Sequence, residues 1–199
     1  MAFFPKDPKK IRARIRSYER KLQKEKEEYG DYSDGYGKRY LLGTLYLLMD
    51  DTEGSLDYFD WFEQEFPDDS GHTIHYLSWT LALYRSGDLA GAKLKFGQAM
   101  LSNLFVMPAL LDLDEEIVLG EFDTMLSLMY LQEMPDEVFT LWRDEELEWG
   151  QEVYYSPDIT ALRERYIEIE RALDITPPSP KRQELVAESF KLKGGDVKF

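Results

Sequence analysis

The apolar residues of this chain recur with the period of an α-helix, three or four positions apart. After Pro8 they form one stripe on a segment whose other positions are mostly charged, and the stripe consists of Ile11, Ile15, Tyr18, Leu22 and Tyr29. Such spacing places side chains on a single helix face, and a proline suits the first helical turn. We therefore predict an amphipathic helix over residues 8–29, with lysines and arginines opposite the stripe.

The middle of the chain contains four more segments with helical periodicity, arranged as two pairs. The predicted pairs are residues 37–49 with 52–66 and residues 73–86 with 88–103. In the second pair Gly87 suits a left-handed helix end, and Asp88 suits the start of the next helix. In the first pair Asp50 stands at the position of Gly87, so the chain must turn there without a glycine.

The two helix pairs repeat one pattern of small and large residues. Leu42, Gly43 and Tyr46 correspond to Trp79, Thr80 and Leu83, which lie 37 positions later. Ser55 and Phe59 correspond in the same way to Ala92 and Phe96. Small residues let two helices approach closely, and large ones fill the space between them. A constant period of this length is the signature of a stacked helical repeat.

This pattern resembles the tetratricopeptide repeat (TPR), in which Leu-Gly and Tyr on one helix precede Ala, Phe and a closing Pro on the next. The resemblance lies within residues 36–104, where Pro67 closes the first copy. The sequence departs from the family pattern at Arg39, Phe62, Thr80 and Leu104. The resemblance implies an all-α stack of helical hairpins, with repeats at about residues 37–67 and 73–104 and a concave surface for partners.

The helical pattern continues after Leu104. The apolar residues Ile117, Val118, Phe122, Leu126 and Met129 predict another buried helix. Pro135 opens a further helix, and the two could form a degenerate third hairpin over about residues 115–145.

The last part of the chain carries a clear helix signal and a stiff connector. Ser156 and Pro157 mark a helix start, followed by a stripe that consists of Ile159, Leu162, Tyr166, Ile169 and Leu173. We expect this helix to cap the stack. Residues 176–180 are a proline-rich connector, and residues 181–193 form a short helix. The prediction is one TPR-like domain over residues 1–175, with an N-terminal amphipathic helix and C-terminal capping helices, followed by the connector and tail of residues 176–199.

Composition adds a charge asymmetry to this picture. The 199 residues carry a net charge of −15 and are 43% hydrophobic. Residues 1–26 hold ten lysines and arginines against three carboxylates, so a basic arm precedes an acidic body. A basic amphipathic helix can bind nucleic acid, an anionic membrane or an acidic protein surface. We favour a helix docked on the chain's own acidic repeats or on a second copy, and we disfavour nucleic acid as the partner.

The chain offers few groups for catalysis. It has no cysteine, which excludes disulfides, thiolate metal sites and a cysteine nucleophile. Its two histidines, His72 and His75, follow Asp68 and Asp69, but their spacing is not that of a helical zinc site. Residues 30–37 are rich in glycine but lack the spacing of a phosphate-binding loop. We expect no enzyme activity, cofactor or metal, and a hydrolase or metal-binding protein that uses the Asp and His cluster is the weaker alternative.

The sequence favours recognition of a protein or peptide. The faces of the first helices that packing leaves unused carry an apolar strip, the predicted groove, which consists of Tyr40, Thr44, Leu47, Leu77, Leu81, Tyr84 and Arg85. This strip lacks the Lys and Asn cluster by which some TPR proteins hold a carboxyl terminus, so an amphipathic helix suits it better. We expect a later helix of this chain or a partner segment to cover it.

Two further expectations concern assembly and location. A self-assembling scaffold, with the basic arm on the acidic surface of a neighbour, is the alternative to a monomeric binding module. No segment is long and apolar enough for a signal peptide or a membrane span, so we expect a cytoplasmic protein that makes no membrane contact.

Overall fold

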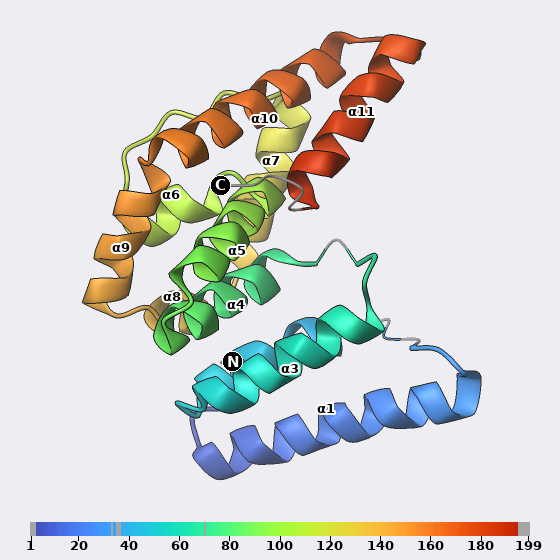
Figure 1. Cartoon of the computed structure of the whole chain (residues 1–199), viewed down its shortest axis with the longest axis vertical. Coiled ribbons are helices and arrows are strands. Elements are labelled where there is room, and N and C mark those ends of the chain that lie inside the picture. Colours follow the sequence, from blue (N-terminus) through green and yellow to red (C-terminus); the bar gives the residue numbers. More distant parts are fainter. Residues whose placement is uncertain (1–2, 33, 35–36, 70, 195–199) are drawn as a thin grey trace. The chain divides into compact units, whose positions relative to one another are not determined.

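Every regular element in the computed structural model is a helix, over the described residues 3–32, 34, 37–69 and 71–194 (Figure 1). The elements in chain order are α1 (Pro8–Tyr29), η1 (Lys38–Tyr40), α2 (Leu42–Leu47), α3 (Thr52–Glu65), α4 (Thr73–Ser86), α5 (Leu89–Ser102), α6 (Val106–Leu111), α7 (Glu121–Glu133), α8 (Asp136–Thr140), α9 (Asp144–Tyr154), α10 (Pro157–Ile175) and α11 (Pro180–Lys193). This confirms the predicted all-α class. Among the described residues, no helix combines the length and apolar character needed to cross a bilayer.

The chain divides into two compact units. Unit 1 contains the residues up to Ala92 together with Pro135–Leu141, and unit 2 contains Lys93–Met134 together with the residues from Trp142 onward. The boundary falls inside α5, so the second predicted helix pair is shared between the units. The single domain predicted for residues 1–175 stays a prediction.

Local end signals give α1 its predicted bounds. The Asp7 carboxylate accepts a hydrogen bond from the backbone N–H of Lys9 at 2.8 Å, and Pro8 occupies the first turn. At the other end Gly30 has a φ of 73° and donates its N–H to the Lys26 carbonyl. Aspartate caps a helix start well, and glycine reaches the left-handed conformation without strain.

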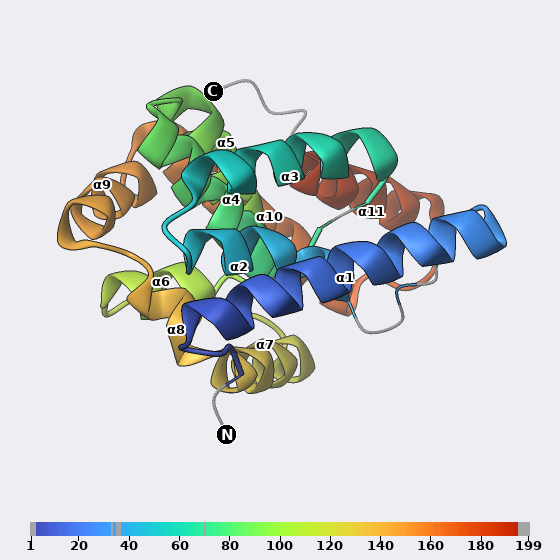
Figure 2. The same cartoon turned by 90° about the horizontal axis from the view of Figure 1, so that it is seen from below.

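The apolar stripe of α1 docks on unit 1 as predicted. Ile11, Ile15 and Leu22 are buried, and α1 packs on α2 and η1 (Figure 2). Tyr18 is half-buried, whereas Tyr29 at the end of the helix is exposed.

Three helices, α2, α3 and α4, pack on one another and form the core of unit 1. Gly43 of α2 lies against the ring of Phe59 of α3, and the Ser55 hydroxyl donates to the Gly43 carbonyl at 3.1 Å. The Phe59 ring in turn stacks on Trp79 of α4, with the ring centroids 4.8 Å apart and the planes nearly parallel. The small and large residues of the repeat pattern therefore meet where the sequence predicts close helix contacts.

The helix predicted over residues 37–49 is shorter than expected. It begins as the single turn η1 and continues as α2 only to Leu47. The buried Asp34 carboxylate accepts the backbone N–H of Arg39 at 2.8 Å and pairs with the ammonium of Lys38 at 2.9 Å. These bonds hold the start of η1. The turn that follows α2 uses Asp50 with a φ of 59°, in the place where Gly87 has a φ of 88°.

In unit 2, the C-terminal helices pack on one another in turn. Helix α9 packs on α6 and on α10, and α10 packs on α11. A Cβ atom on Gly150 of α9 would lie 2.9 Å from Cδ2 of Leu111 in α6, so glycine permits this approach. The Arg165 guanidinium joins α10 to α11 by two bonds of 2.8 Å to the Glu188 carboxylate. The positions of α10 and α11 confirm the helices predicted from residues 156 and 181.

The helix predicted to open at Pro135 is in fact two helices. Helix α8 ends at Thr140, and α9, which the apolar pattern did not predict, begins at Asp144. The Glu146 carboxylate accepts the backbone N–H of Arg143 at 2.8 Å, which gives the new helix a capped start. The two helices of the expected third hairpin, α7 and α8, belong to different units.

The burial predicted for α7 is wrong. Phe122, Leu126 and Met129 are exposed, although their spacing is that of a core stripe. Ile117, from the same apolar set, is buried before the helix begins. The periodicity therefore predicted the helix correctly, but it predicted a buried apolar face where that face is exposed to solvent.

Candidate functional site

The structure buries four residues of the predicted groove. Thr44, Leu47, Leu77 and Leu81 are each at most 2% exposed. Thr44 lies between α2 and α4, where its hydroxyl oxygen is 2.6 Å from the hydroxyl oxygen of Ser78. These side chains cannot contact a partner in this conformation. This corrects the predicted groove, because the helix faces that the sequence pattern left for a partner are instead packed inside the protein.

The other three groove residues, Tyr40, Tyr84 and Arg85, are half-exposed, and Tyr40 and Arg85 form hydrogen bonds within unit 1. The Tyr40 hydroxyl donates to the Asp69 carboxylate at 2.8 Å. The Arg85 guanidinium donates to the Leu141 carbonyl at 2.8 Å, just after α8, which itself packs on α4. A later segment of the chain therefore contacts Arg85 at this end of the strip.

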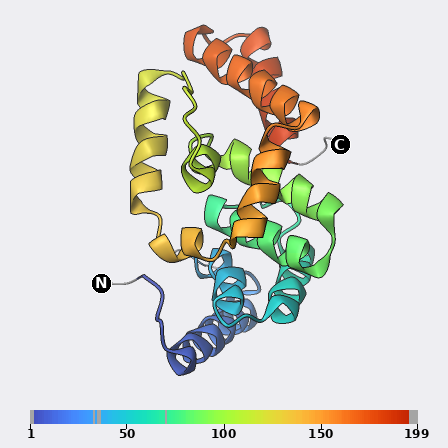
Figure 3. The same ribbon diagram turned by 90° about the vertical axis from the view of Figure 1, so that its left-hand side faces the viewer.

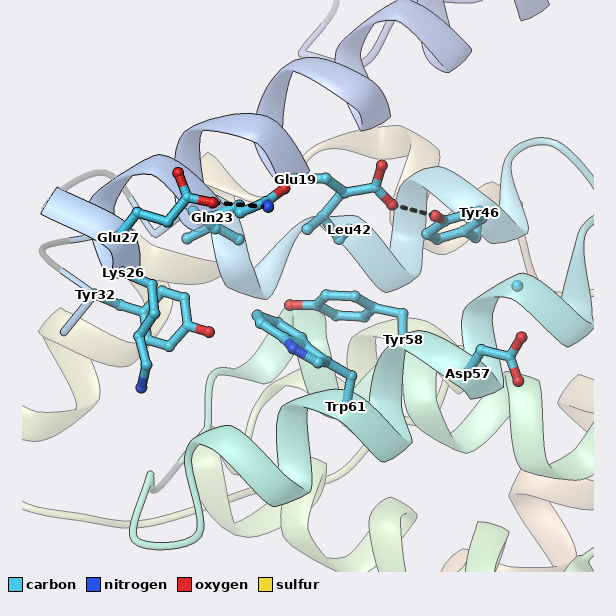
Figure 4. A pocket seen from close by; sticks show the side chains of 12 residues that line it. Glu19, Gln23, Lys26, Glu27, Tyr32, Leu42, Tyr46, Asp57, Tyr58 and Trp61 are labelled. Carbon is cyan, nitrogen blue, oxygen red and sulfur yellow. Dashed lines mark hydrogen bonds between the residues drawn. The ribbon is translucent and has the colours of Figure 1, made fainter. Parts of the chain in front are cut away.

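Unit 1 contains a different candidate, a hollow of about 470 Å³ between α1, α2 and α3 (Figure 4). We name it the Trp61 hollow. Its lining consists of Glu19, Leu22, Gln23, Lys26, Glu27, Tyr32, Leu42, Tyr46, Gly54, Asp57, Tyr58 and Trp61. Apolar and aromatic side chains form its floor, and charged side chains from α1 and α3 stand around it.

The spacing of residues along α3 supplies one wall of the hollow. Asp57 and Trp61 are four positions apart and so share a face of the helix. The adjacent Tyr58 is 7% exposed, and its ring centroid lies 5.4 Å from that of Trp61. One turn earlier, Gly54 leaves room for the Tyr46 ring of α2, since a Cβ atom there would lie 2.8 Å from Tyr46 Cδ1.

A short network closes one end of the hollow. The Tyr32 ring meets the Trp61 ring edge to face, with centroids 5.8 Å apart. Lys26 of α1 lies 4.9 Å from the centre of the Tyr32 ring, and its ammonium is 3.2 Å from the Glu65 carboxylate. The Tyr32 hydroxyl donates to the same carboxylate at 3.0 Å. Glu65 therefore offsets the one positive charge that borders the hollow.

Carboxylates dominate the remaining electrostatics. Glu19, Glu27 and Asp57 border the hollow, against Lys26 alone. The Tyr46 hydroxyl donates to Glu19, and burial together with that bond raises the pKa of Tyr46. Burial and the bond to Glu65 raise the pKa of Tyr32 to about 12. Both phenols therefore stay protonated at neutral pH, and the lining combines neutral aromatic rings with negative charge.

A second hollow of about 520 Å³ lies next to the first along α1. The two share Glu19 and Tyr46, so the hydrogen bond between these residues stands at their common border. Arg12 and Arg16 line the second hollow from α1, and Asp50 and Asp51 line it from the turn before α3. The two hollows together extend along much of α1.

The histidine and aspartate cluster is part of the packing of unit 1. His75 is fully buried, and its ring centroid lies 4.2 Å from that of Phe62 and 5.0 Å from that of Phe59. His72 stacks on Tyr40 at 5.5 Å, and burial lowers the pKa of His72. Within the described residues, no three His, Asp or Glu side chains are grouped so that they could hold a metal ion.

Comparisons of this chain with protein-family models, with curated proteins and with solved structures found no match. The resemblance to the TPR family therefore rests on the quoted residues alone.

The pattern of small and large residues assigns Tyr46 to packing between helices and does not predict the Trp61 hollow. One signal was present in the sequence, because Trp61 is a large aromatic residue on the helix face of Asp57 rather than on the stripe of Phe59 and Phe62. The distance between α1 and α3, which creates the hollow, has no counterpart in the local sequence.

Proposed function

We propose that this chain is a protein-binding module that accepts a lysine or arginine side chain of a partner peptide in the Trp61 hollow. The observation that carries the proposal is the combination of neighbouring aromatic rings, Tyr32, Tyr58 and Trp61, with three carboxylates at one hollow. A cation is attracted to the face of an aromatic ring, most strongly to tryptophan. It also gains charge-assisted hydrogen bonds to carboxylates.

The form of the site favours a peptide over a small molecule. The second hollow continues the first along α1 and adds side chains of both charges, Arg12 and Arg16 on one side and Asp50 and Asp51 on the other. An extended peptide could place its basic side chain beside Trp61 while neighbouring residues lie in the second hollow. The proposal keeps the expected role, recognition of a protein partner in a TPR-like hairpin stack, and moves the site from the first helices of the repeats to the α1 side of α3.

The test is an NMR titration that follows the indole N–H resonance of Trp61. The chain has four tryptophans, so the Trp61→Phe variant assigns the resonance. The probes are two capped pentapeptides of alanine, one with a central arginine and one with a central glutamate. We expect the arginine peptide to shift the Trp61 resonance and the glutamate peptide to leave it in place, because the lining carries more negative than positive charge.

Charge variants separate the hollow from the general acidity of the protein. Asp57→Asn removes a carboxylate that lines the hollow, and we expect it to weaken arginine-peptide binding by about 1 kcal/mol, or about fivefold in Kd. Asp60→Asn is the matched control, because Asp60 is an exposed residue of α3 outside the lining. Equal losses in the two variants, or equal binding of both peptides, would overturn the proposal.

A further inference from the structure

Helix α7 in unit 2 presents a continuous apolar face to solvent. Phe122 is 66% exposed, Met125 47%, Leu126 45% and Met129 50%. These residues stand at positions i, i+3, i+4 and i+7, so they fall within an arc of about 100° on one side of the helix. Figure 3 shows α7, in yellow, standing apart from α10, in orange, of the same unit.

The inward side of α7 carries small polar residues as well as larger side chains. Thr124, Ser127, Tyr130 and Leu131 are half-buried, and the Asn103 amide donates to the Ser127 carbonyl at 3.0 Å. The segment before the helix is held as well, since the Arg171 guanidinium donates to the Val118 carbonyl at 2.7 Å. Met134, directly after the helix, is buried. Anchors before, within and after α7 therefore fix it with its apolar stripe outward.

The chain segment that contains this stripe carries charge of a single sign. From Phe96 to Trp142 the chain contains no lysine, arginine or histidine. Helix α7 itself carries Glu121, Asp123 and Glu133, and all three are exposed. An apolar face framed by carboxylates is complementary to a helix with an apolar stripe and basic flanks. The two methionines suit such a contact, because their flexible side chains adapt to different partner surfaces.

A second copy of this chain fits the face less well. Pairing α7 with another α7 would place the carboxylates of the two helices together, and like charges repel. The basic helix α1 has already buried its apolar residues Ile11, Ile15 and Leu22. Elsewhere in the described chain the exposed large apolar residues are scattered, as at Tyr29, Ile175 and Phe190. No described segment outside α7 offers an apolar stripe to pair with it.

We propose that the exposed face of α7, formed by Phe122, Met125, Leu126 and Met129, docks a basic amphipathic helix of a partner protein. This site lies in unit 2, is separate from the Trp61 hollow, and does not depend on the function proposed for that hollow. The apolar stripe supplies the contact area, and the carboxylates select a partner with lysine or arginine beside its own stripe.

The experiment measures binding of the full-length chain to a labelled 14-residue helical peptide of leucine and lysine, with leucines at positions i, i+3, i+4 and i+7. A peptide of the same composition in shuffled order, and one with glutamate in place of lysine, are the comparison probes. We expect the Leu/Lys helix to bind at least tenfold more tightly than either. Similar binding of all three peptides would overturn the proposal.

Variants locate the binding on α7. The double variant Phe122→Ser, Met129→Ser should weaken binding of the Leu/Lys helix at least tenfold and leave the melting temperature unchanged, because both side chains are exposed. Phe190→Ser on α11 is the matched control, since Phe190 is 68% exposed, and it should bind the peptide as the wild type does. A loss in this control as large as in the double variant, or full binding by the double variant, would overturn the assignment to α7.

Two alternative occupants give distinct results. If a second copy covers α7, light scattering shows a wild-type dimer and a monomeric Phe122→Ser, Met129→Ser variant. If a membrane covers it, phosphatidylcholine and phosphatidylserine vesicles retain the wild type but not the variant. Either result would overturn the proposal, and a monomer that ignores vesicles and binds the basic helix supports it.

Discussion

At the scale of single residues, Gly43 decides how closely α2 and α3 approach. A Cβ atom at this position would lie 2.7 Å from Cε1 of Phe59, well inside normal contact distance. The Phe59 ring cannot move away easily, because it stacks on Trp79 and is fully buried. One absent methyl group therefore sets the packing of three helices.

We predict that Gly43→Ala lowers the free energy of unfolding by about 1 to 3 kcal/mol, the usual cost of overpacking a core. Urea denaturation followed by circular dichroism measures this change. Gly194→Ala is the control, because Gly194 has a φ of −70° and the nearest atom to an added Cβ lies at 3.4 Å. The control should stay within about 0.5 kcal/mol of the wild type. Equal stability of the two variants would contradict the close approach at Gly43.

At the scale of elements, the docking of α1 shapes the Trp61 hollow. Leu22 is 2% exposed and belongs both to the buried stripe of α1 and to the lining of the hollow. The stripe holds α1 against α2, while Glu19, Lys26 and Glu27 border the hollow from the same helix. The hollow therefore exists only while α1 is docked.

We predict that Leu22→Ala lowers the free energy of unfolding by about 2 to 5 kcal/mol, because it leaves a cavity between α1 and α2. Lys21→Ala, at the adjacent exposed position, should change stability by less than about 0.5 kcal/mol. Chemical denaturation compares the two. A Leu22→Ala protein as stable as the wild type would mean that α1 is not docked in solution, and the hollow would then lose one wall.

At the scale of the whole molecule, acid sensitivity follows from carboxylates held in both units. The bond from Lys93 lowers the pKa of Asp158 to about 2, across a distance of 2.5 Å. The bond from Arg165 lowers the pKa of Glu188. In unit 1, burial acts to raise the pKa of Asp34, but hydrogen bonds from Arg39 and Lys38 lower it overall.

These shifts predict the direction of the pH dependence. A carboxylate whose pKa is lower in the folded state contributes stability above its unfolded pKa of about 4, and loses that contribution as the pH falls through the folded value. We therefore expect the melting temperature to fall between about pH 4.5 and pH 2. The Asp158→Asn variant should have a lower melting temperature than the wild type at pH 7, and its melting temperature should fall less over this pH range. The melting temperature of Asp60→Asn should fall as that of the wild type does. An Asp158→Asn protein with the same acid slope as the wild type would contradict the role of the pair with Lys93.

Local sequence signals were sufficient to predict a helix end wherever a capping residue lies within a few positions of that end. Asp7, Pro8 and Gly30 bound α1, and Gly87 ends α4, because a cap acts within a few residues of chain. The small and large residues of the repeat, such as Gly43 and Phe59, also predicted which helix faces meet. The existence of most helices, the bounds of α1 and α4, and the all-α class were thus properties of the sequence by itself.

Tertiary structure decided which faces are covered and where a site forms. Periodicity shows that Phe122, Leu126 and Met129 share one side of a helix, but burial depends on what packs against that side, and the chain places Thr124 and Ser127 inward instead. Leu77 and Leu81 were expected on a groove and are buried for the same reason. The Trp61 hollow brings Glu19 together with Asp57 and Trp61, which are separated by about 40 positions of sequence. Only the distance between two docked helices, set by the side chains between them, could create it.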